Sequence, residues 1–368
     1  MNRFLNKKVD RTFALIVVIL TCAGFVIFSS ASLGLLARNG ASFSKVALSQ
    51  LFFGIGLGSL AAYGLSRVQY RLWRKWSLPI LILSIVATLL VFLPYIGAEY
   101  GGAKRWIHIA GISFQPAELL KIGVVIYFAA WLSSVRERVA EFRYGLLPLF
   151  VLLAISGTIL LLQPDTDTFI IIAIASLAMY VSAGGSMKHV LLIGLIGLIG
   201  IMFLATMRPY IKSRLMTFLN PAADPLGAGY QIQQSLIAIG SGGFSGRGFG
   251  QSIQKFQYLP EPIGDSIFAV EAEEFGFIGS MTLIGIFLVF MLRGLRIATH
   301  APDKFGGLLA IGIVILIIAN SFLNIAAMLG IIPLSGLPLL FVSHGGTAML
   351  ITLAEVGILL NISRYQKN

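Results

Sequence analysis

The chain consists mainly of long apolar runs separated by short polar segments. Ten runs have about the 20 residues that a helix needs to cross the hydrocarbon core of a bilayer. These runs are residues 12–32, 46–65, 77–96, 117–134, 146–162, 168–185, 189–206, 267–292, 306–330 and 344–362. They lack the alternation of apolar and polar residues that a transmembrane strand shows. The pattern predicts an all-α polytopic membrane protein with ten transmembrane helices.

The composition agrees with this prediction. Of the 368 residues, 57% are hydrophobic and 11% are charged, and the mean hydropathy is +0.90. Too little polar surface remains for a soluble globule of this size. We therefore expect residues 1–368 to form a single integral membrane domain.

Lysine and arginine residues predict the orientation, because cytoplasmic loops carry an excess of both. If both termini are cytoplasmic, basic clusters before the first helix, after the second and after the fourth all lie on the inner side. The net charge of +12 then reflects topology and contact with anionic lipid head groups. No nucleic-acid-binding motif accompanies the charge. We expect membrane lipids as partners, and not nucleic acid.

The beginning of the chain resembles a signal peptide, because Ser30, Ala31 and Ser32 follow a basic start and an apolar run. That run is too long for a typical signal peptide, so we expect an uncleaved first helix. The lone Cys22 excludes a disulfide within the chain, and the four histidines lack the paired spacing typical of zinc sites. No GxxxxGK[ST] motif occurs, which argues against ATP-driven transport by this chain alone.

In this orientation the polar, Pro-rich and Gly-rich stretches lie at the outer face. They are residues 101–121, 163–168, 208–265 and 333–346. The longest forms a large outer loop, about residues 207–266, between the seventh and eighth helices. Binding and catalytic groups concentrate on loops that a rigid scaffold holds. An enzyme at this face cannot use cytoplasmic ATP, so it must act on an activated substrate or use an existing gradient.

Two parts of the outer loop have recognisable patterns. Residues 208–219 mix basic and apolar positions, which predicts a short amphipathic helix lying in the membrane interface. This helix could bind anionic lipid head groups or simply anchor the loop. The glycines of residues 240–250 could bring backbone N–H groups close to a phosphate, or they could form a flexible turn.

Five of the fifteen carboxylates of the chain lie within fourteen positions: Glu261, Asp265, Glu271, Glu273 and Glu274. An unpaired charge near the bilayer centre costs roughly 3 kcal/mol or more. Glu271 and Glu274 share one helix face, so we expect them to point at basic partners within the bundle. Asp265 could cap the eighth helix. It could instead be a general base, because the prolines of LPEP (259–262) restrict the backbone beside it.

Basic residues of the outer face could neutralise a diphosphate, by the electrostatic effect that stabilises negative charge developing on a leaving group. These candidates are Arg105, Arg208, Lys212, Arg214, Arg247 and Lys255.

Several ordered motifs resemble the SEDS family (shape, elongation, division and sporulation), the bacterial peptidoglycan polymerases represented by FtsW and RodA. The motifs are GAKRWI and QPAELLK within 102–121, QPD at 163–165, GYQIQQSLIAIGSGG at 229–243, KFQYLPEPIGDSIFAVEAEEFGFIG at 255–279 and PLSGLPLLFVSHGG at 333–346. The resemblance covers essentially the whole chain. KFQYLPEP and the closing GILLNISR are more similar to the division branch, FtsW, than to the elongation branch, RodA.

The resemblance implies a ten-helix fold with cytoplasmic termini. It also implies an inverting glycosyltransferase that polymerises lipid II at the outer face of the bacterial cytoplasmic membrane, for septal wall synthesis in cell division. The catalytic aspartate of the family falls on Asp265. Matching positions expected to bind substrate are Arg105, Trp106, Glu118, Lys121, Asp165, Lys255, Glu261 and Glu274, to which we add Arg208 from the basic residues above.

Three segments depart from the family pattern. QPDTDT stands where QPD-Leu-Gly-Thr is usual, SHGGT stands where Ser-Tyr-Gly-Gly-Ser is usual, and PLLF stands where PLPF is commoner. The departures leave Asp265 intact. They leave open the roles of Asp167 and His344 and the shape of the loop around residues 338–347.

The expected donor is the growing glycan strand on polyprenyl diphosphate, and the acceptor is the 4-hydroxyl of the GlcNAc of lipid II. Asp265 would deprotonate that hydroxyl, and a divalent cation, Mg²⁺ or Mn²⁺, could assist the departing diphosphate. Expected partners are a class B penicillin-binding protein, whose membrane helix would pack against lipid-facing helices, and regulators of the divisome or of elongation.

Other functions remain open at this point. Ten helices with charges in or near the membrane also suit a flippase for the lipid-linked precursor, and a scaffold that recruits a partner or an elongation-type polymerase are further alternatives. Transporters often carry internal repeats and place decisive charges near the membrane midplane. Here the unusual residues gather at one face and no clear repeat is visible, which favours an enzyme.

Overall fold

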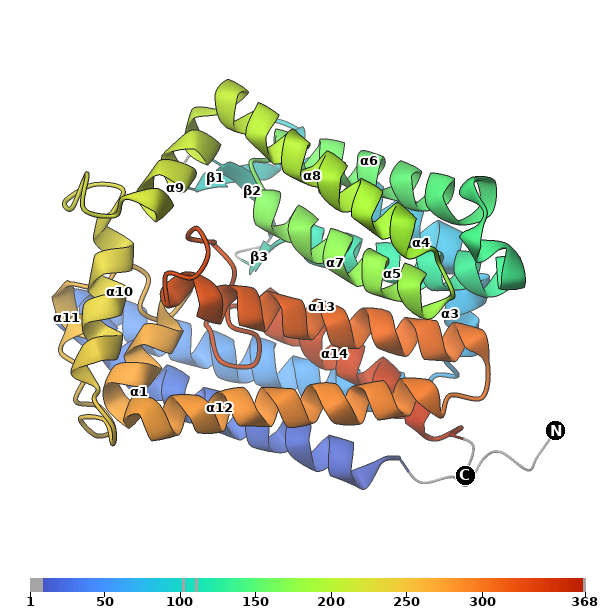
Figure 1. Cartoon of the computed structure of the whole chain (residues 1–368). Helices are drawn as coiled ribbons and strands as arrows, with labels where there is room; N and C mark the ends of the chain where they lie inside the picture. The colour runs from blue at the N-terminus through green and yellow to red at the C-terminus, as the bar shows by residue number, and fades with distance from the viewer. Residues whose placement is uncertain (1–8, 101–102, 110–111, 367–368) are drawn as a thin grey trace.

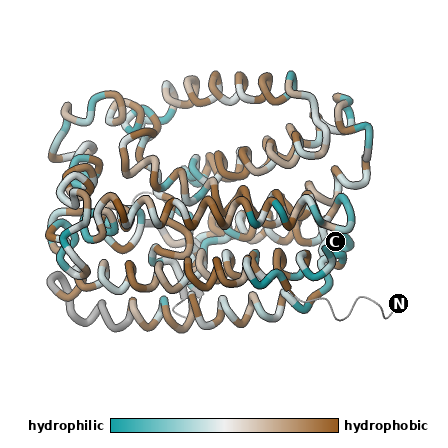
Figure 2. Tube along the Cα trace, turned by 60° about the horizontal axis from the view of Figure 1, so that its bottom comes forward, coloured by the Kyte–Doolittle hydropathy of each residue, from teal (hydrophilic) through white to brown (hydrophobic). Residues whose placement is uncertain are grey.

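The structure, a computed structural model, describes residues 9–100, 103–109 and 112–366. These residues form a bundle of long helices (Figure 1). The two ends of the described chain meet at one end of the bundle, where the Asp10 N–H donates to Ser363 Oγ at 3.0 Å. Figure 2 shows that apolar residues dominate the middle of the helices, while polar residues gather toward both ends of the bundle.

Long apolar helices coincide with the predicted runs. They are α1 (Arg11–Ser49), η1 (Gln50–Leu57) continuing into α2 (Gly58–Arg67), α4 (Ser77–Leu89), α5 (Pro116–Val135), α6 (Leu147–Leu162), α7 (Thr166–Ser182), α8 (Met187–Met207), α12 (Ile267–Thr299), α13 (Lys304–Met328) and α14 (Gly346–Ser363). Among the described residues, eight segments are long and apolar enough to cross a membrane. Two shorter apolar helices, Ser77–Phe92 and Thr166–Ser182, coincide with the other two runs. The polytopic α-helical membrane fold is confirmed, and a count of ten crossings stays a prediction.

Helix α13 lies at the centre of the bundle and packs against α5, α7 and α12, whereas α14 packs against α2. Close helix contacts in membranes depend on small residues. Gly357 of α14 is one, because a Cβ atom there would lie only 2.5 Å from the Ala62 carbonyl oxygen. Helix α8 differs from α13, since its apolar side chains are mostly exposed and are available to lipid.

Short elements connect the helices at the end that holds the chain termini. They are α3 (Arg71–Lys75), η3 (Arg136–Ala140) and η4 (Phe142–Leu146). Asp303, before α13, accepts from Tyr70 OH at 2.6 Å and pairs with Arg71 Nε at 3.1 Å. Arg293 of α12 pairs with Asp10 at 2.9 Å. These polar contacts join the start of α13 to the segment around α3, and α12 to the start of α1.

The opposite end carries the smaller elements (Figure 1). They are η2 (Leu90–Phe92), the antiparallel strands β1 (Gly97–Tyr100), β2 (Ala103–Ile109) and β3 (Ile112–Phe114), and the helices α9 (Pro209–Leu219), α10 (Tyr230–Ser241) and α11 (Gln254–Gln257). Helix α9 confirms the short helix predicted for residues 208–219. The three-stranded sheet, in the order β1-β2-β3, was not predicted. Its strands are too short to show a clear alternation along the sequence.

Helix α12 breaks at Gly276, whose φ is 65°. The Gly-rich stretch 240–250 packs against this break as a loop. The N–H groups of Arg247 and Gly248 donate to the carbonyls of Glu273 and Glu274, at 3.0 and 2.9 Å. Two N–H groups of the stretch are therefore bonded to α12, which favours a structural loop over a phosphate cradle.

Candidate functional site

Asp265 lies in the turn directly before α12. The N-cap of α12 is Ser266, and the Ser266 side chain makes no capping hydrogen bond. The interpretation of Asp265 as an N-cap is therefore wrong. Asp265 as a whole is half-buried.

The backbone of this turn is fixed by α13 and by the loop between α13 and α14. Three hydrogen bonds, each 2.7 Å long, do this: Asn324 Nδ2 donates to the Asp265 carbonyl, Ser343 Oγ to the Gly264 carbonyl, and the His344 N–H to the Ile263 carbonyl. Asn324 also donates to the Leu337 carbonyl at 2.7 Å. The position of Asp265 thus depends on segments that follow it by at least 59 residues.

Gly336, in the loop before α14, marks a point where three side chains converge. A Cβ atom placed on Gly336 would lie 3.6 Å from Asp265 Oδ2, 3.9 Å from Arg105 Nη1 and 4.0 Å from Arg214 Nη2. Arg105 comes from β2 and Arg214 from α9. The fold therefore gathers one carboxylate and two guanidinium groups around a residue that has no side chain.

Arg105 is held by the segment between α6 and α7. Its Nε donates to the Gln163 carbonyl at 3.2 Å, and its Nη2 donates to the Pro164 carbonyl. Its Nη1 lies 3.9 Å from Asp165 Oδ1. Asp165 also caps α7 by accepting from the Thr168 N–H at 3.3 Å. Two predicted site residues, Arg105 and Asp165, therefore lie together, and Arg105 also borders the space next to Asp265.

Arg214 is held by Asp167, in the first turn of α7. Arg214 Nη1 lies 2.9 Å from Asp167 Oδ2, and the Gly336 N–H donates to the same oxygen at 3.1 Å. A second contact joins the same two helices, because Thr166 Oγ1 and Tyr210 OH lie 2.7 Å apart. Helix α9 is thereby attached to α7 beside the Asp265 turn.

Burial raises the pKa of Asp265 to about 7, and the carboxylates of Glu261 and Asp167 contribute to this rise. The guanidinium groups of Arg214 and Arg105 oppose it. Burial also raises the pKa of Asp165, against the effect of Arg105. A carboxyl with a pKa near the working pH is well suited to take a proton from a hydroxyl group.

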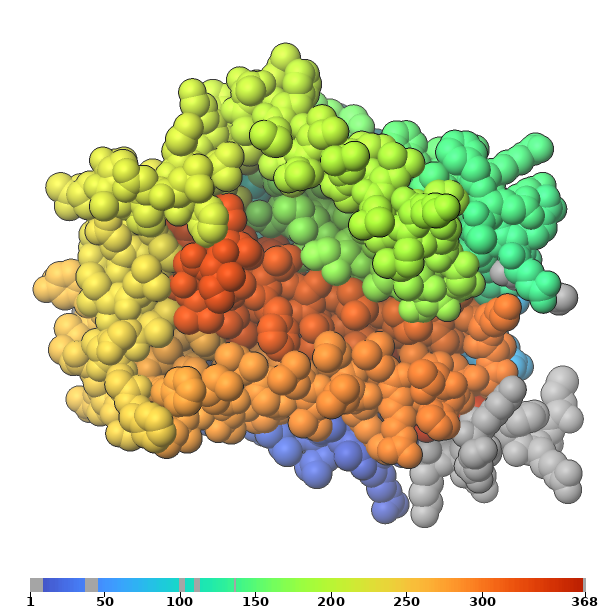
Figure 3. Space-filling view, viewed as in Figure 1, coloured from blue at the N-terminus to red at the C-terminus, as the bar shows by residue number. Residues whose placement is uncertain are grey.

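An apolar cavity of about 290 Å³ adjoins this polar cluster. It lies between α7, α8, α9, α13 and the loop at 332–337, where Figure 3 shows a hollow beneath α8. Its walls are formed largely by Ile, Leu and Pro side chains, with Asp167 and Arg214 among the lining residues. A ligand with a charged head and a hydrocarbon tail would match both parts of this arrangement.

Glu118 and Lys121 form a buried ion pair on α5, with Nζ and Oε2 2.9 Å apart. Lys121 Nζ also donates to Asn320 Oδ1 at 3.4 Å, and Asn320 donates to the Pro338 carbonyl at 2.6 Å. The structure therefore places this pair inside the bundle, where it supports the loop that carries Gly336.

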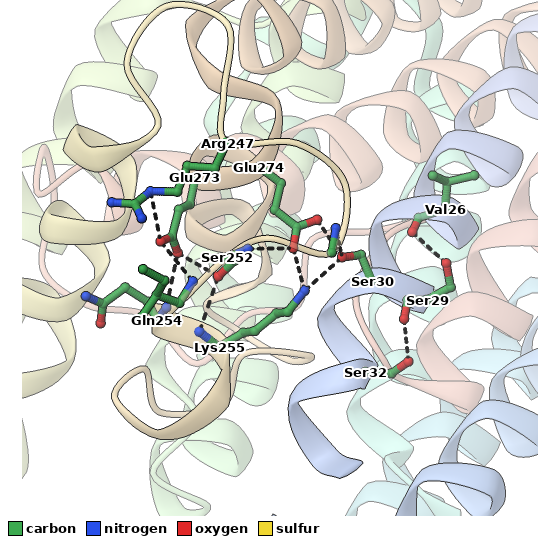
Figure 4. A network of polar contacts seen from close by, with 12 residues as sticks. Val26, Ser29, Ser30, Ser32, Arg247, Ser252, Gln254, Lys255, Glu273 and Glu274 are labelled. Carbon is green, nitrogen blue, oxygen red and sulfur yellow. Dashed lines mark hydrogen bonds and ion pairs between the residues drawn. The ribbon is translucent and has the colours of Figure 1, made fainter. Parts of the chain in front are cut away.

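Lys255 and Glu274 pair with each other (Figure 4). Within the described part of the chain, neither residue forms an ion pair with Asp265. Their side chains are 0% and 1% exposed, and Nζ lies 2.5 Å from Oε1. Ser30 of α1 bonds to both of them, at 3.0 Å from Nζ and 2.5 Å from Oε2. Nearby, Arg247 lies 3.5 Å from Glu273. The prediction of basic partners within the bundle is thus confirmed for Glu274.

Glu271 also points into the bundle but bonds to a hydroxyl, since Ser280 Oγ donates to it at 2.8 Å. No ion pair joins Glu271 to a base in the described part of the chain, so the expected basic partner was wrong for this residue. Ser280 follows the break at Gly276, so this bond spans the kink of α12.

The other predicted site residues lie at the edge of the cluster. Trp106 follows Arg105 on β2, half-buried and opposite Ala98 of β1. Glu261 is exposed in the Asp265 turn, with a left-handed backbone (φ 45°). Arg208 is exposed at the start of α9, and within the described ranges it forms no ion pair. Of the six basic candidates, only Arg105 and Arg214 converge on Asp265.

Over the described residues, no group of three or more His, Cys, Asp or Glu side chains is arranged to hold a metal ion. Mg²⁺ often takes only one or two carboxylates and completes its shell with water and substrate phosphates. The assisting divalent cation stays a prediction.

Gly336, Asn320 and Asn324 were missed by the sequence analysis. The two asparagines could have been noticed in the sequence, because they lie four positions apart in a run that is otherwise apolar except for Ser321. In the structure both are fully buried. Polar side chains in such a run are costly unless they find partners. Gly336 left no comparable signal, since its role depends on three distant segments.

Comparison with known proteins gives matches that span the chain. A family model for FtsW, RodA and SpoVE, described as "Cell cycle protein", matches residues 10–368. Stage V sporulation protein E of Bacillus subtilis (strain 168) is 36% identical over 365 residues, which are 98% of this chain and 99% of that protein. A probable peptidoglycan glycosyltransferase FtsW of Trichlorobacter lovleyi is 40% identical over 363 residues, which are 98% of this chain and 94% of that protein.

Solved structures show the same fold. One solved structure is described as "Structural coordination of polymerization and crosslinking by a peptidoglycan synthase complex". The matching chain of that structure aligns with a TM-score of 0.78 and 26% sequence identity, and the alignment covers 98% of this chain and 99% of the matching chain. RodA of Thermus thermophilus has a TM-score of 0.71 and 25% identity, covering 98% of each chain. The agreement in sequence and in fold extends over nearly the whole length, and the chain belongs to the FtsW/RodA/SpoVE family of integral membrane proteins.

Proposed function

We propose that the protein is a peptidoglycan glycosyltransferase that polymerises lipid II into glycan strands. The observation that carries the proposal is the convergence of Asp265, Arg105 and Arg214 around Gly336, beside an apolar cavity. The proposed substrates have a sugar to be deprotonated, a diphosphate to be neutralised and a polyprenyl chain to be accommodated. Several relatives are named probable peptidoglycan glycosyltransferases, which supports the proposal.

In the proposed reaction, the Asp265 carboxylate takes the proton of the 4-hydroxyl of the lipid II GlcNAc. The freed oxygen attacks the anomeric carbon of the growing strand, and the bond from that carbon to the diphosphate oxygen breaks. The electron pair leaves with the diphosphate, whose charge Arg105 and Arg214 stabilise. One displacement converts the α-linked diphosphate into a β-glycosidic bond, so no covalent enzyme intermediate is needed.

The proposed location is the outer face of the bacterial cytoplasmic membrane, with both chain termini in the cytoplasm. The contact between Asp10 and Ser363 supports termini on the same side, and the Asp265 cluster lies at the other end of the bundle (Figure 1). Lipid II carries its own activation in the diphosphate, so chemistry at this face needs no ATP.

We propose a class B penicillin-binding protein as the partner that cross-links the new strands. A structural relative comes from a peptidoglycan synthase complex that couples polymerisation to crosslinking, which supports this partner. Its membrane helix would pack on exposed apolar helix faces of this chain. The similarity to proteins named FtsW further supports a role at the division septum, together with divisome regulators.

The testing experiment is polymerisation of purified lipid II by the protein in nanodiscs with its cognate transpeptidase. We compare the wild type with Arg214→Gln, and use Arg138→Gln as the control. Arg138 is also paired with a carboxylate, Glu141, but it lies in η3 near the chain termini. We expect polymer from the wild type and the control, and about tenfold less from Arg214→Gln because one diphosphate ligand is lost. Absence of polymer from a folded, partner-bound wild type would contradict the proposal, and translocation of lipid II would then favour a flippase.

The pH dependence of polymerisation should follow the ionisation of Asp265. The base works only when it is deprotonated, and burial raises the pKa of Asp265 to about 7. We therefore expect kcat/KM to be constant well above pH 7 and to fall about tenfold for each unit below it, because kcat/KM follows the ionisation of the free enzyme. Initial rates between pH 5 and 9 at lipid II concentrations well below KM measure this, and a kcat/KM unchanged down to pH 5 would rule out Asp265 as the base.

Replacement of Gly336 should block the same site without removing any of its charges. The Cβ atom of Gly336→Ala would meet Asp265 and both arginines at ordinary contact distances of 3.6–4.0 Å, whereas Gly336→Leu would fill the space between them. We expect a modest loss of polymerisation for alanine and a loss of at least about 100-fold for leucine. Thermal stability of both variants provides the control for folding, and an active, folded leucine variant would place the reacting sugars elsewhere.

A further inference from the structure

The carboxylate that holds Arg214 has no role in the reaction described above. Asp167 Oδ2 accepts hydrogen bonds from Arg214 Nη1 and from the Gly336 N–H, at 2.9 and 3.1 Å. The Asp167 side chain is only 12% exposed. This residue belongs to the segment QPDTDT (163–168), which joins α6 to the first turn of α7.

The two terminal nitrogens of Arg214 face different groups. Nη1 bonds to Asp167, whereas Nη2 lies 4.0 Å from the Gly336 Cβ position, which is 3.6 Å from Asp265 Oδ2. A guanidinium group is planar and rigid, so a bond at one nitrogen restricts the direction of the other. Neither arginine of the cluster is within ion-pair distance of Asp265: Arg214 pairs with Asp167 and Arg105 with Asp165.

We propose that Asp167 is a positioning residue for the Asp265 centre. It holds Arg214 back from a direct ion pair with Asp265 and directs Nη2 into the space where the diphosphate leaves. The inference rests on the proposed function, since it assigns a second carboxylate to the same site. Asp167 acts through Arg214 and does not itself touch the reacting atoms.

The position of Arg214 affects the pKa of Asp265. Burial, Glu261 and Asp167 raise its pKa, while Arg214 and Arg105 lower it. An opposite charge within about 4–6 Å typically lowers a carboxyl pKa by about 1–3 units. Loss of Asp167 would remove one carboxylate and free Arg214 to bond to Asp265. Both changes lower the pKa of Asp265, and a more acidic carboxyl is a weaker base.

The first test measures the Asp265 carboxyl without any substrate. Infrared pH titration of the full chain in nanodiscs, with Asp265→Asn as the reference spectrum, isolates the signal of this carboxyl. We expect a midpoint near pH 7 in the wild type and about 1–3 units lower in Asp167→Ala. Asp167→Asn should shift it less, because its amide oxygen can still accept from Arg214 although the charge is lost. A midpoint unchanged in both variants would overturn the proposal.

The second test asks whether Asp167 acts through Arg214. In the Arg214→Gln background, Asp167→Ala should shift the midpoint by less than half as much as it does in the wild type. In polymerisation, Asp167→Ala alone should lower kcat about tenfold, and the acidic limb of its kcat/KM profile should move with the infrared midpoint. Equal shifts in both backgrounds, or a lower melting temperature without any shift, would reduce Asp167 to a structural role.

Glu141→Ala is the matched control, because it also removes a carboxylate that pairs with an arginine. Glu141 pairs with Arg138 at 3.0 Å, and both side chains are exposed near the chain termini, in the turn between α5 and α6. Glu141→Ala should leave the Asp265 midpoint and the rate unchanged. The infrared titration also separates the two proposals: a wild type that makes no polymer contradicts the proposed function, whereas the titration still decides whether Asp167 positions Arg214.

Discussion

Asp265→Asn should abolish glycan polymerisation while lipid II binding is retained. The amide is nearly the same size as the carboxyl but cannot accept a proton at neutral pH, and a positioned general base contributes roughly 100- to 10,000-fold to a rate. The backbone bonds to this turn from Asn324, Ser343 and His344 do not involve the side chain, so the fold should persist. Product length on gels and binding of labelled lipid II, both with the transpeptidase present, measure the two effects.

The control for this variant is Asp224→Asn. Asp224 is an exposed aspartate in the same outer segment, and its carboxylate accepts from the nearby N–H groups of Gly227 and Ala228, at 3.0 and 2.9 Å. This variant should polymerise as the wild type does. Undiminished polymer from Asp265→Asn would remove Asp265 from the chemistry, and loss of both polymer and binding would make it a substrate ligand.

Lys255→Met should destabilise the protein far more than it affects substrate affinity. The change leaves the carboxylate of Glu274 buried without its cation, and among the described residues Ser30 Oγ and the Ser252 N–H remain as its donors. Removal of one partner from a buried ion pair costs about 3–5 kcal/mol. We expect a clearly lower melting temperature in detergent and, at temperatures where the variant is folded, an unchanged KM for lipid II.

Two further variants test this interpretation of Lys255. The double variant Lys255→Met, Glu274→Leu removes both charges and should recover most of the lost stability, because an apolar pair of similar volume often replaces a buried ion pair at little cost. Arg247→Gln breaks the pair with Glu273, in which the arginine is 37% and the glutamate 1% exposed. It should cost less than Lys255→Met, because Ser252 Oγ and the N–H groups of Ile253 and Gln254 still donate to Glu273. A stable Lys255→Met protein with a raised KM would instead make Lys255 a substrate ligand.

Some site residues could be chosen from the sequence because their local context is informative. Asp265 follows a turn with two prolines and precedes a long apolar helix, so it had to lie at a membrane surface. A basic partner for Glu274 could be predicted because an unpaired charge inside a membrane bundle is costly. The sequence did not show which basic residue would pair with Glu274. The six basic candidates look equivalent along the chain, yet Lys255 is fully buried against Glu274 and Arg208 is exposed to solvent.

The sequence by itself determined the membrane class, the helical segments, the placement of polar segments at the ends of these helices, and the family. Each of these depends on local hydropathy or on an uninterrupted motif, and both are properties of neighbouring residues. Only the tertiary structure decided which residues meet. Asp167 holds Arg214 across 47 positions, and Asn324 holds Asp265 across 59. Such contacts are set by helix packing and loop closure, so the partners of a charge become visible only when the bundle is assembled.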